Sequence, residues 1–405
     1  MQFLSLHQAD ILYFKYIIAS VVILTKKINI LYIIDYLHDQ GGTERHLLYL
    51  LKLLSKERYN CIVVAFDTGT TKLTEEIKEI GVPLVHIPVG RYYTINAIKR
   101  AFDLRRIIID NNIDIVQTFH FKSDFYGAIV ARLSGVKNIV SSKRDIGDLK
   151  SSFHFFLNKL ARGITKNYIV VAEAVGKIVV EREKVPQDKL KIIYNGVDLE
   201  KFSPPKLSEI AKSREKLSLS ETDFVIGTVA WMRPEKNYDV LFAGFEQAAE
   251  KIKELKLVIV GGGPLLGLFK DYVREKGIGG QVFFSGPVND VRLYLQALDV
   301  ACLIPGSNEG FSNSIIEKMA MGLPLIVSDV GGNAEAVLDG YNGIVIPPNN
   351  PRLLSDAIYK LWQNLKMRKE MGSRSLKRVR EKFTLEEMTK SHEELYESLV
   401  SAGNQ

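Results

Sequence analysis

Short, continuous apolar runs alternate regularly along this chain with stretches of helical periodicity. A run that is apolar at nearly every position is typical of a parallel strand buried on both faces. Strands that alternate with helices predict parallel sheets with right-handed crossovers. The runs lie at 28–37, 61–66, 84–89, 114–119, 136–142 and 167–172, and again at 223–231, 255–263, 281–288, 299–305, 324–330 and 343–348. The predicted fold class is therefore α/β, with two doubly wound parallel sheets.

The chain is long enough for two domains, because 405 residues exceed the usual size of one. Turn and linker signals, Asn195-Gly196 and Pro204-Pro205, separate the two series of strands. We therefore predict an N-terminal domain at 28–197 and a second domain at 198–380. The charged, helical pattern of 381–405 predicts a C-terminal helix that crosses back to the first domain.

Residues 1–27 are predicted to form a separate extension. The run from Ile11 to Leu24 is almost wholly apolar but contains Lys15. It is shorter than the roughly 20 residues that cross a bilayer, and no small-residue cleavage site follows it. We interpret it as an extension outside the fold, such as an over-long assigned start, with a peripheral membrane anchor as the alternative.

Composition excludes several classes of protein. With 46% hydrophobic and 25% charged residues, the chain is neither disordered nor a polytopic membrane protein. Its two cysteines, Cys61 and Cys302, lie inside apolar runs, so no disulfide framework is expected and a cytoplasmic location fits. No RNA-binding or zinc-finger signature occurs, so nucleic acid is not an expected partner.

Charge divides unevenly between the two halves. Residues 1–196 hold 28 Lys and Arg against 19 Asp and Glu, a balance of +9, whereas the remainder has a balance of −2. A basic half is suited to anionic lipid headgroups at the inner membrane surface or to a phosphate-bearing acceptor. Ordinary solvated charge is the alternative.

The clearest candidate site is EGFSNSIIE, which runs from Glu309 to Glu317 after an apolar run and opens a helix. One carboxylate in a loop and another two turns into a helix can face the same ligand, with the N–H groups of the helix N-terminus between them. The loop carboxylate suits sugar hydroxyls and the helical one suits a ribose diol. Two solvated glutamates near a helix start are the alternative.

These residues belong to an ordered set of motifs that resembles the retaining glycosyltransferases of family 4, the glycosyl transferases group 1. The resemblance extends from residue 28 to about 400 and implies the two-domain GT-B architecture, in which the domains face a cleft. GGTER and SSKRDIG also resemble a bacterial subgroup that acts on exported polysaccharides. The motifs are GGTERHLLYLL, YNGVDLEKFSP, GTVAWMRPEKNYDVLFAGF, LVIVGGGP, VFFSGPV, EGFSNSIIEKMAMGLPLIVSDVGGNAEAV and NGIVIPP.

The resemblance implies a role for each matching residue. Arg233 and Lys236 would grip the donor diphosphate, for which a guanidinium fork and an ammonium are suited. Glu309 would contact the donor sugar, Glu317 would bind the ribose, and His120 would lie beside the transferred sugar. The remaining expected contacts are Gly41 and Gly42 at the β-phosphate, Gly310, Phe311 and Ser312 around the sugar hydroxyls, and Gly261, Gly262 and Val288 beside the base.

The same resemblance implies transfer with retention and without a covalent enzyme intermediate. The protein would stabilise the developing charges electrostatically, through Arg233, Lys236 and backbone amides. An inverting enzyme needs an acceptor-side base, for which Asp145 and Asp148 are available. No Asp-x-Asp motif occurs where it would be needed, so no metal is expected. The expected donor is a UDP-, GDP- or ADP-sugar with no further cofactor, and the expected acceptor is a glycan or a polyprenyl-linked molecule.

Two segments and three alternative functions stay open at this point. Residues 151–166 have aromatic and basic positions that suit either core packing or a helix at the cytoplasmic face of a membrane. Ala172 stands where the family often has serine. The alternatives are a sugar-nucleotide epimerase of the same architecture, a non-catalytic sugar-binding partner, and a dehydrogenase; VGGGPL lacks the full G-x-G-x-x-G spacing that the last requires.

Overall fold

The computed structural model describes residues 27–38, 41–90, 94–145 and 161–402. These residues form two compact units. Unit 1 holds the described residues up to Ser142, residues 161–168 and those from His392 onward, and unit 2 holds the others. The predicted extension at the N-terminus, most of 151–166 and Asp148 lie outside the described residues, and the predicted domain boundaries stay a prediction.

The first sheet has the strand order β3-β2-β1-β4-β5-β6-β7. Strand β1 is central, and its residues 30–34 are completely buried, as a strand covered on both faces requires. The order reverses direction between β1 and β4, which creates a switch point of the kind where open α/β sheets bind ligands. The strands are β1 (Ile28–Ile34), β2 (Tyr59–Ala65), β3 (Leu84–His86), β4 (Ile115–Phe119), β5 (Asn138–Lys143), β6 (Asn167–Val170) and β7 (Leu190–Ile192).

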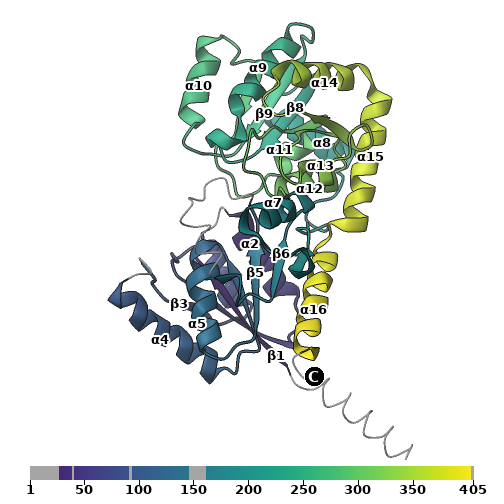
Figure 1. The fold of residues 1–405 in the computed structure, drawn as a ribbon. Helices are drawn as coiled ribbons and strands as arrows, with labels where there is room; N and C mark the ends of the chain where they lie inside the picture. The colour runs from purple at the N-terminus through teal and green to yellow at the C-terminus, as the bar shows by residue number, and fades with distance from the viewer. Residues whose placement is uncertain (1–26, 39–40, 91–93, 146–160, 403–405) are drawn as a thin grey trace, which may run out of the picture. The chain divides into compact units, whose positions relative to one another are not determined.

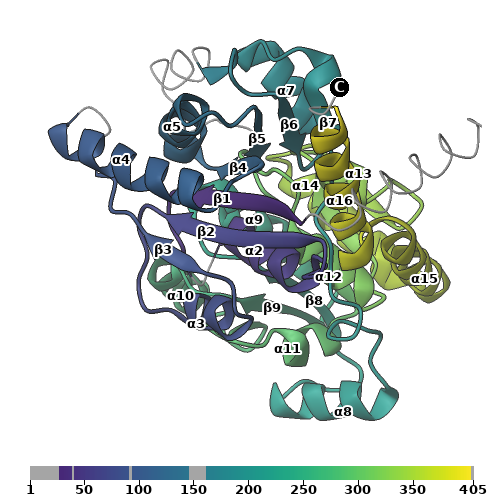
Figure 2. The ribbon, with the colours of Figure 1, turned by 90° about the horizontal axis from the view of Figure 1, so that it is seen from below.

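The helices of unit 1 lie between its successive strands, as the alternating pattern predicted (Figures 1 and 2). Thr71 and Thr94 cap α3 and α4, because each side chain accepts a hydrogen bond from a backbone N–H of the first turn. Helices α4 and α5 pack against each other. The helices are α2 (Gly42–Leu53), α3 (Lys72–Glu79), α4 (Ile95–Asp110), the π-helical turn η1 (Ser123–Gly127) and α5 (Ala128–Leu133).

The C-terminal helix α16 (Leu385–Ser401) returns to the N-terminal sheet, as the sequence predicted. The hydroxyl of Tyr396 lies 3.2 Å from the hydroxyl of Tyr32 in β1 and donates to the carboxamide oxygen of Gln117 in β4 at 2.5 Å. All three side chains are completely buried. A buried polar chain of this kind fixes the helix to one register because each member would be left unpaired elsewhere.

Unit 2 contains the second parallel sheet, with the order β10-β9-β8-β11-β12-β13. Its strands are β8 (Phe224–Val229), β9 (Leu255–Val260), β10 (Val282–Phe284), β11 (Val300–Leu303), β12 (Leu325–Ser328) and β13 (Gly343–Ile346). Its helices are α7 (Glu173–Glu183), α8 (Leu207–Lys216), α9 (Tyr238–Ala249), α10 (Leu266–Glu275), α11 (Arg292–Gln296), α12 (Asn313–Ala320), α13 (Asn333–Ala336), α14 (Pro351–Gln363) and α15 (Leu365–Lys382). The predicted fold class, two Rossmann-like parallel sheets, is confirmed.

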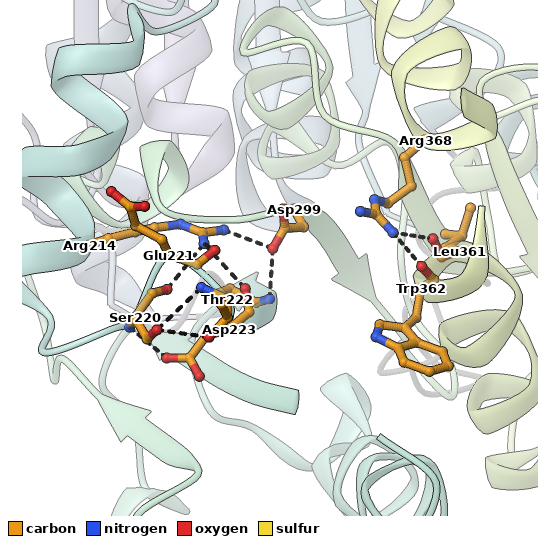
Figure 3. A network of polar contacts seen from close by, with 10 residues as sticks. Arg214, Ser220, Glu221, Thr222, Asp223, Asp299, Leu361, Trp362 and Arg368 are labelled. Atoms are coloured by element: carbon orange, nitrogen blue, oxygen red, sulfur yellow. Dashed lines mark hydrogen bonds and ion pairs between the residues drawn. The ribbon is translucent and has the colours of Figure 1, made fainter. Parts of the chain in front are cut away.

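Two arginines of unit 2 hold helices in place through several hydrogen bonds each (Figure 3). Arg214 of α8 pairs with Asp299 at 2.8 Å and donates to the carbonyls of Ser220, Glu221 and Asp223. Asp299 also accepts the N–H of the second residue of β8. Arg368 of α15 donates to two carbonyls at the end of α14. The sequence did not predict β7, which lies just before the Asn195-Gly196 turn, or α8, which follows Pro204-Pro205.

Among the described residues, no helix has both the length and the apolar character that crossing a bilayer demands.

Candidate functional site

The candidate site of unit 2 lies at the carboxyl end of β11, in the loop that leads into α12. Ser312 is the N-cap residue of α12 and adopts an extended conformation, so the helix begins directly after the loop residues Glu309–Phe311. The hydroxyl of Ser314 donates to the carbonyl of Val229 at 2.7 Å and joins the first turn of α12 to the end of β8. We call residues 309–312 the donor loop.

A cation and a carboxylate meet at this loop. The ammonium of Lys236 lies 2.5 Å from the Oε2 atom of Glu309, and both side chains are largely buried. Lys236 ends a short 3₁₀ helix, Pro234–Lys236, and Arg233 precedes that helix. The Arg233 side chain is 55% exposed and lies 3.9 Å from the carboxylate of Glu235. The structure thus brings Lys236 and Glu309 together and leaves the Arg233 guanidinium accessible nearby.

The carbonyls of the donor loop are used for folding. The carbonyl of Gly310 accepts the N–H of Gly332 at 2.6 Å, and the carbonyl of Phe311 accepts the Nδ2 of Asn195 at 3.0 Å. Within the described chain, no acceptor is recorded for the N–H groups of Gly310, Phe311 and Ser312. A loop that turns its carbonyls to the protein and keeps its N–H groups beside a helix N-terminus is suited to bind anions or hydroxyl oxygens.

A tract before α8 holds the donor loop in place. Asn195 is buried, and its carboxamide oxygen accepts a hydrogen bond from the guanidinium of Arg144 while its nitrogen donates to the loop. The ring of Tyr194 lies 5.1 Å from that of Phe311, measured between centroids, and its hydroxyl donates to Glu335 at 3.0 Å. The sequence interpretation of Asn195 as a turn signal missed this contact, because the two partners are 116 residues apart.

Helix α12 carries Glu317, which is half-buried, and next to it a lysine that the sequence interpretation passed over. Lys318 is completely buried, and its ammonium donates to the carbonyl of Cys302 at 3.1 Å. Burial lowers the pKa of Lys318 to about 8, while the nearby Cys302 and Glu317 act in the opposite direction. The position of this lysine inside the apolar sequence IIEKMAM was the signal from which its burial could have been predicted.

The glycine-rich segment after β9 has a packing explanation that needs no ligand. Gly261 and Gly263 have φ angles of 133° and 138°, which L-amino acids rarely adopt. A Cβ atom at Gly261 would overlap the carbonyl of Ala230, and one at Gly263 would lie 2.6 Å from the backbone of Met232. These glycines allow two backbone segments to meet. Gly262 and the half-buried Val288 lie at the ends of neighbouring strands, where the sequence predicted contacts with the base.

Unit 1 positions the other candidates at the carboxyl ends of β1 and β4. Gly41 is the N-cap residue of α2, which begins at Gly42, and the side chain of Glu44 fills the space where a Cβ of Gly41 would lie. His120 follows β4 with a φ of 71°, and its ring stacks on Tyr36 at 4.3 Å. A strained backbone at a ligand-binding edge is consistent with a functional residue.

The strain at His120 is supported by a buried carboxylate. Asp35 accepts the N–H groups of Lys122 at 2.8 Å and Ser123 at 2.7 Å, at the start of the π-helical turn. Burial raises the pKa of Asp35 to about 6, although these two hydrogen bonds lower it. In none of the described segments are three His, Cys, Asp or Glu side chains arranged to hold a metal ion. Asp145, the described candidate for an inverting base, is exposed.

Solved structures identify the fold class. The crystal structure of HepE from Anabaena in complex with UDP has a TM-score of 0.82 at 19% identity, and the match covers 92% of this chain and 100% of that one. WaaG, a glycosyltransferase involved in lipopolysaccharide biosynthesis, has a TM-score of 0.69 at 15% identity, covering 89% and 98%. The two Rossmann-like parallel sheets therefore define the GT-B fold class.

Sequence comparisons identify the family. The model described as Glycosyltransferase Family 4 matches residues 40–201, and that described as Glycosyl transferases group 1 matches residues 209–378. The UDP-Gal:alpha-D-GlcNAc-diphosphoundecaprenol alpha-1,3-galactosyltransferase of Escherichia coli is 29% identical over 328 residues, which are 76% of this chain and 82% of that protein. The chain belongs to the family 4 glycosyltransferases, and the predicted family is confirmed.

Proposed function

We propose that this glycosyltransferase moves a sugar from a nucleoside diphosphate sugar, held by unit 2, to a glycan or polyprenyl-linked acceptor, with retention of configuration. The observation that carries the proposal is the donor loop, whose unused N–H groups lie beside the Lys236–Glu309 pair at the start of α12. This arrangement offers hydrogen-bond donors for sugar oxygens and a cation for a phosphate within one small region.

Each part of the donor has a suitable partner. Lys236 and the accessible guanidinium of Arg233 would bind the diphosphate, and Glu309 would accept hydrogen bonds from sugar hydroxyls. Glu317 would accept both hydroxyls of the ribose, since an ionised carboxylate has two acceptor oxygens. We do not assign a ligand to Gly261 and Gly263, because backbone packing already accounts for them.

Retention would follow if the acceptor oxygen attacked the anomeric carbon on the face that the diphosphate leaves. The bond from that carbon to the phosphate oxygen breaks, the bond to the acceptor oxygen forms, and the acceptor's proton passes to the departing diphosphate. The main task of the protein would be to stabilise the negative charge that develops on the diphosphate, which Arg233 and Lys236 would do through their positive charges. No step in this scheme needs an enzyme nucleophile or a metal ion.

The relatives guide the choice of substrates to test. The E. coli relative is named for UDP-Gal and a diphosphoundecaprenol-linked acceptor, and HepE is solved with UDP. We therefore propose a UDP-sugar as the first donor to test, ahead of GDP- and ADP-sugars. We also propose that the enzyme works in cell-surface polysaccharide synthesis at the cytoplasmic face of the membrane, where a polyprenyl-linked acceptor would be located.

The test is thermal stabilisation of the purified full chain by a panel of UDP-, GDP- and ADP-sugars. A bound ligand stabilises the folded state by about 3 kcal/mol at a hundredfold excess over Kd. Glu317→Ala should weaken binding of the sugar nucleotide that stabilises the wild type roughly 10- to 100-fold, because a carboxylate that would accept two hydrogen bonds is lost. Arg233→Ala should act in the same direction.

The matched controls are Arg274→Ala and Glu275→Ala, which alter exposed charges at the end of α10. They should leave the stabilisation unchanged. The proposal fails if no sugar nucleotide stabilises the folded wild type, or if Glu317→Ala and Arg233→Ala bind it as tightly as the controls do.

A further inference from the structure

Helix α4 of unit 1 presents an unusual outward face. Ala97, Leu104 and Ile108 are buried and point to the core. On the opposite side, four large apolar side chains are exposed, although a surface helix normally carries polar residues there. These are Ile95, Ile98, Phe102 and Ile109, which are 77%, 60%, 68% and 47% exposed. We call these four residues the α4 stripe.

The members of the stripe lie on one face of the helix. With 3.6 residues per turn, its four members fall within an arc of roughly 60° and span about 21 Å. Leu133, which is 74% exposed at the end of α5, lies beside it, because the guanidinium of Arg105 donates to the carbonyl of Leu133 at 2.9 Å. Helices α4 and α5 lie side by side in Figures 1 and 2. The four apolar side chains of the stripe therefore share one face of α4, and the end of α5 lies next to its Arg105 flank.

Basic residues flank the stripe on both sides. Helical geometry places Lys99 and Arg106 on one flank and Arg105 on the other. Arg106 is paired with Asp110 at 3.3 Å. Among the described residues, no carboxylate pairs with Lys99 or Arg105. Arg100 is likewise paired with Asp103 at 2.9 Å. Helix α4 therefore carries four cations against two carboxylates, a net charge of +2, in the half of the chain that has a balance of +9.

We propose that the α4 stripe docks on the surface of a bilayer that contains anionic phospholipid, with its apolar side chains at the level of the acyl boundary. An amphipathic helix with an apolar stripe and cations at its edges lies in the plane of such a surface. The lysine and arginine stems extend past the apolar side chains and bring their charges to the headgroups. The inference rests on the membrane part of the proposed function and on none of the donor-site residues.

The area and charge of the stripe disfavour a second copy of this chain as its occupant. A stripe about 21 Å long and one helix wide offers roughly 200 Å², whereas a stable interface needs about 800 Å² from each partner. A symmetric contact between two copies would also bring the same basic flanks toward each other. A lipid surface has neither restriction.

The test is co-sedimentation of the full chain with vesicles of phosphatidylcholine, alone or mixed with phosphatidylglycerol. The wild type should bind the mixed vesicles. The double variant Ile98→Asp/Phe102→Asp should lose at least about tenfold in vesicle affinity, because two apolar side chains no longer enter the interface. Lys99→Glu/Arg105→Glu should lose about fivefold or more for each cation, and the loss should shrink at high salt.

The matched control is Leu268→Asp on α10, which replaces another exposed leucine, 61% exposed in unit 2, and should bind like the wild type. The proposal is overturned if the wild type does not bind mixed vesicles. It is also overturned if Ile98→Asp/Phe102→Asp binds the mixed vesicles as tightly as the wild type, which is the result expected if residues 1–26 alone anchored the chain. A variant that changes only from dimer to monomer, with its vesicle affinity unchanged, would overturn it too. Sugar-nucleotide stabilisation measured without vesicles tests the donor site separately, so the two failures are distinguishable.

Discussion

Lys318 predicts a measurable dependence of stability on pH. Its ammonium lies in the core of unit 2 with no solvent exposure and donates to the carbonyl of Cys302. Burial disfavours the charged form, which lowers the pKa of Lys318 from 10.5 to about 8. The same burial raises the pKa of the neighbouring Cys302 thiol to about 12, so that group stays neutral over the range tested.

The sign and the magnitude follow from this difference in pKa. Between pH 8 and 10.5 the unfolded chain binds a proton at this lysine that the folded chain does not, so stability rises with pH in this window. Below pH 8 both states are protonated, and the folded state carries the full cost of the buried charge. The difference between 10.5 and about 8 corresponds to about 3 kcal/mol, of which about 2 kcal/mol should be recovered between pH 7 and 9.5.

The assay is urea unfolding, followed by circular dichroism at pH 7 and at pH 9.5, for the wild type and Lys318→Met. Relative to this variant, the wild type should gain about 2 kcal/mol of unfolding free energy between the two pH values. Lys360→Met, which removes an exposed lysine from α14, should run parallel to the wild type. Parallel pH profiles for the wild type and Lys318→Met would show that burial does not lower the pKa of Lys318 in the folded protein, whatever the absolute stability of the variant.

Two further predictions concern the hydrogen bonds of two side chains, Arg214 and Asn195. Arg214→Ala should lower the unfolding free energy by about 2 kcal/mol in the same urea titrations, because Asp299 and three carbonyls lose the guanidinium that donates to them. The control Arg274→Ala, at a side chain that is 76% exposed, should change the unfolding free energy by less than about 0.5 kcal/mol. Asn195→Asp keeps the acceptor for Arg144 but has no N–H for the donor loop, so calorimetry should show UDP-sugar affinity falling roughly tenfold while UDP affinity changes little. The control Asn342→Asp changes another buried asparagine that donates to a backbone carbonyl, and it should not alter the ratio of UDP-sugar affinity to UDP affinity. If Asn195→Asp lowered the affinities for UDP and UDP-sugar equally, the donor loop would not be specifically affected.

The strands and most helices could be predicted because their signal is local. A strand buried on both faces must be apolar along its length, so runs such as INILYII identify it without knowledge of its neighbours. Strand β7 escaped prediction because it has three residues and is partly exposed, and α8 escaped because its exposed, charged sequence follows two prolines. Neither element carries a continuous apolar signal.

The contacts of the site could not be predicted in the same way. The sequence indicated that Glu309 and Lys236 serve one ligand, but not that they pair at 2.5 Å. The contact between Asn195 and the carbonyl of Phe311 joins residues that no local pattern relates. The burial of Lys318 likewise depends on the packing of α12 against β11, which is a property of the tertiary structure.

Packing also separates the motif residues that inform on function from those that do not. A Cβ at Gly261 or Gly263 would meet the backbone of 230–232, so their presence in a motif is explained by folding alone. The exposed guanidinium of Arg233 has no such explanation, because it lies 3.9 Å from its nearest carboxylate and stabilises little there. The first N–H groups of any helix lack an intrahelical partner, so those of the donor loop support a binding site only together with the Lys236–Glu309 pair next to them. A bound diphosphate sugar is therefore supported most directly by the residues whose positions the fold does not require.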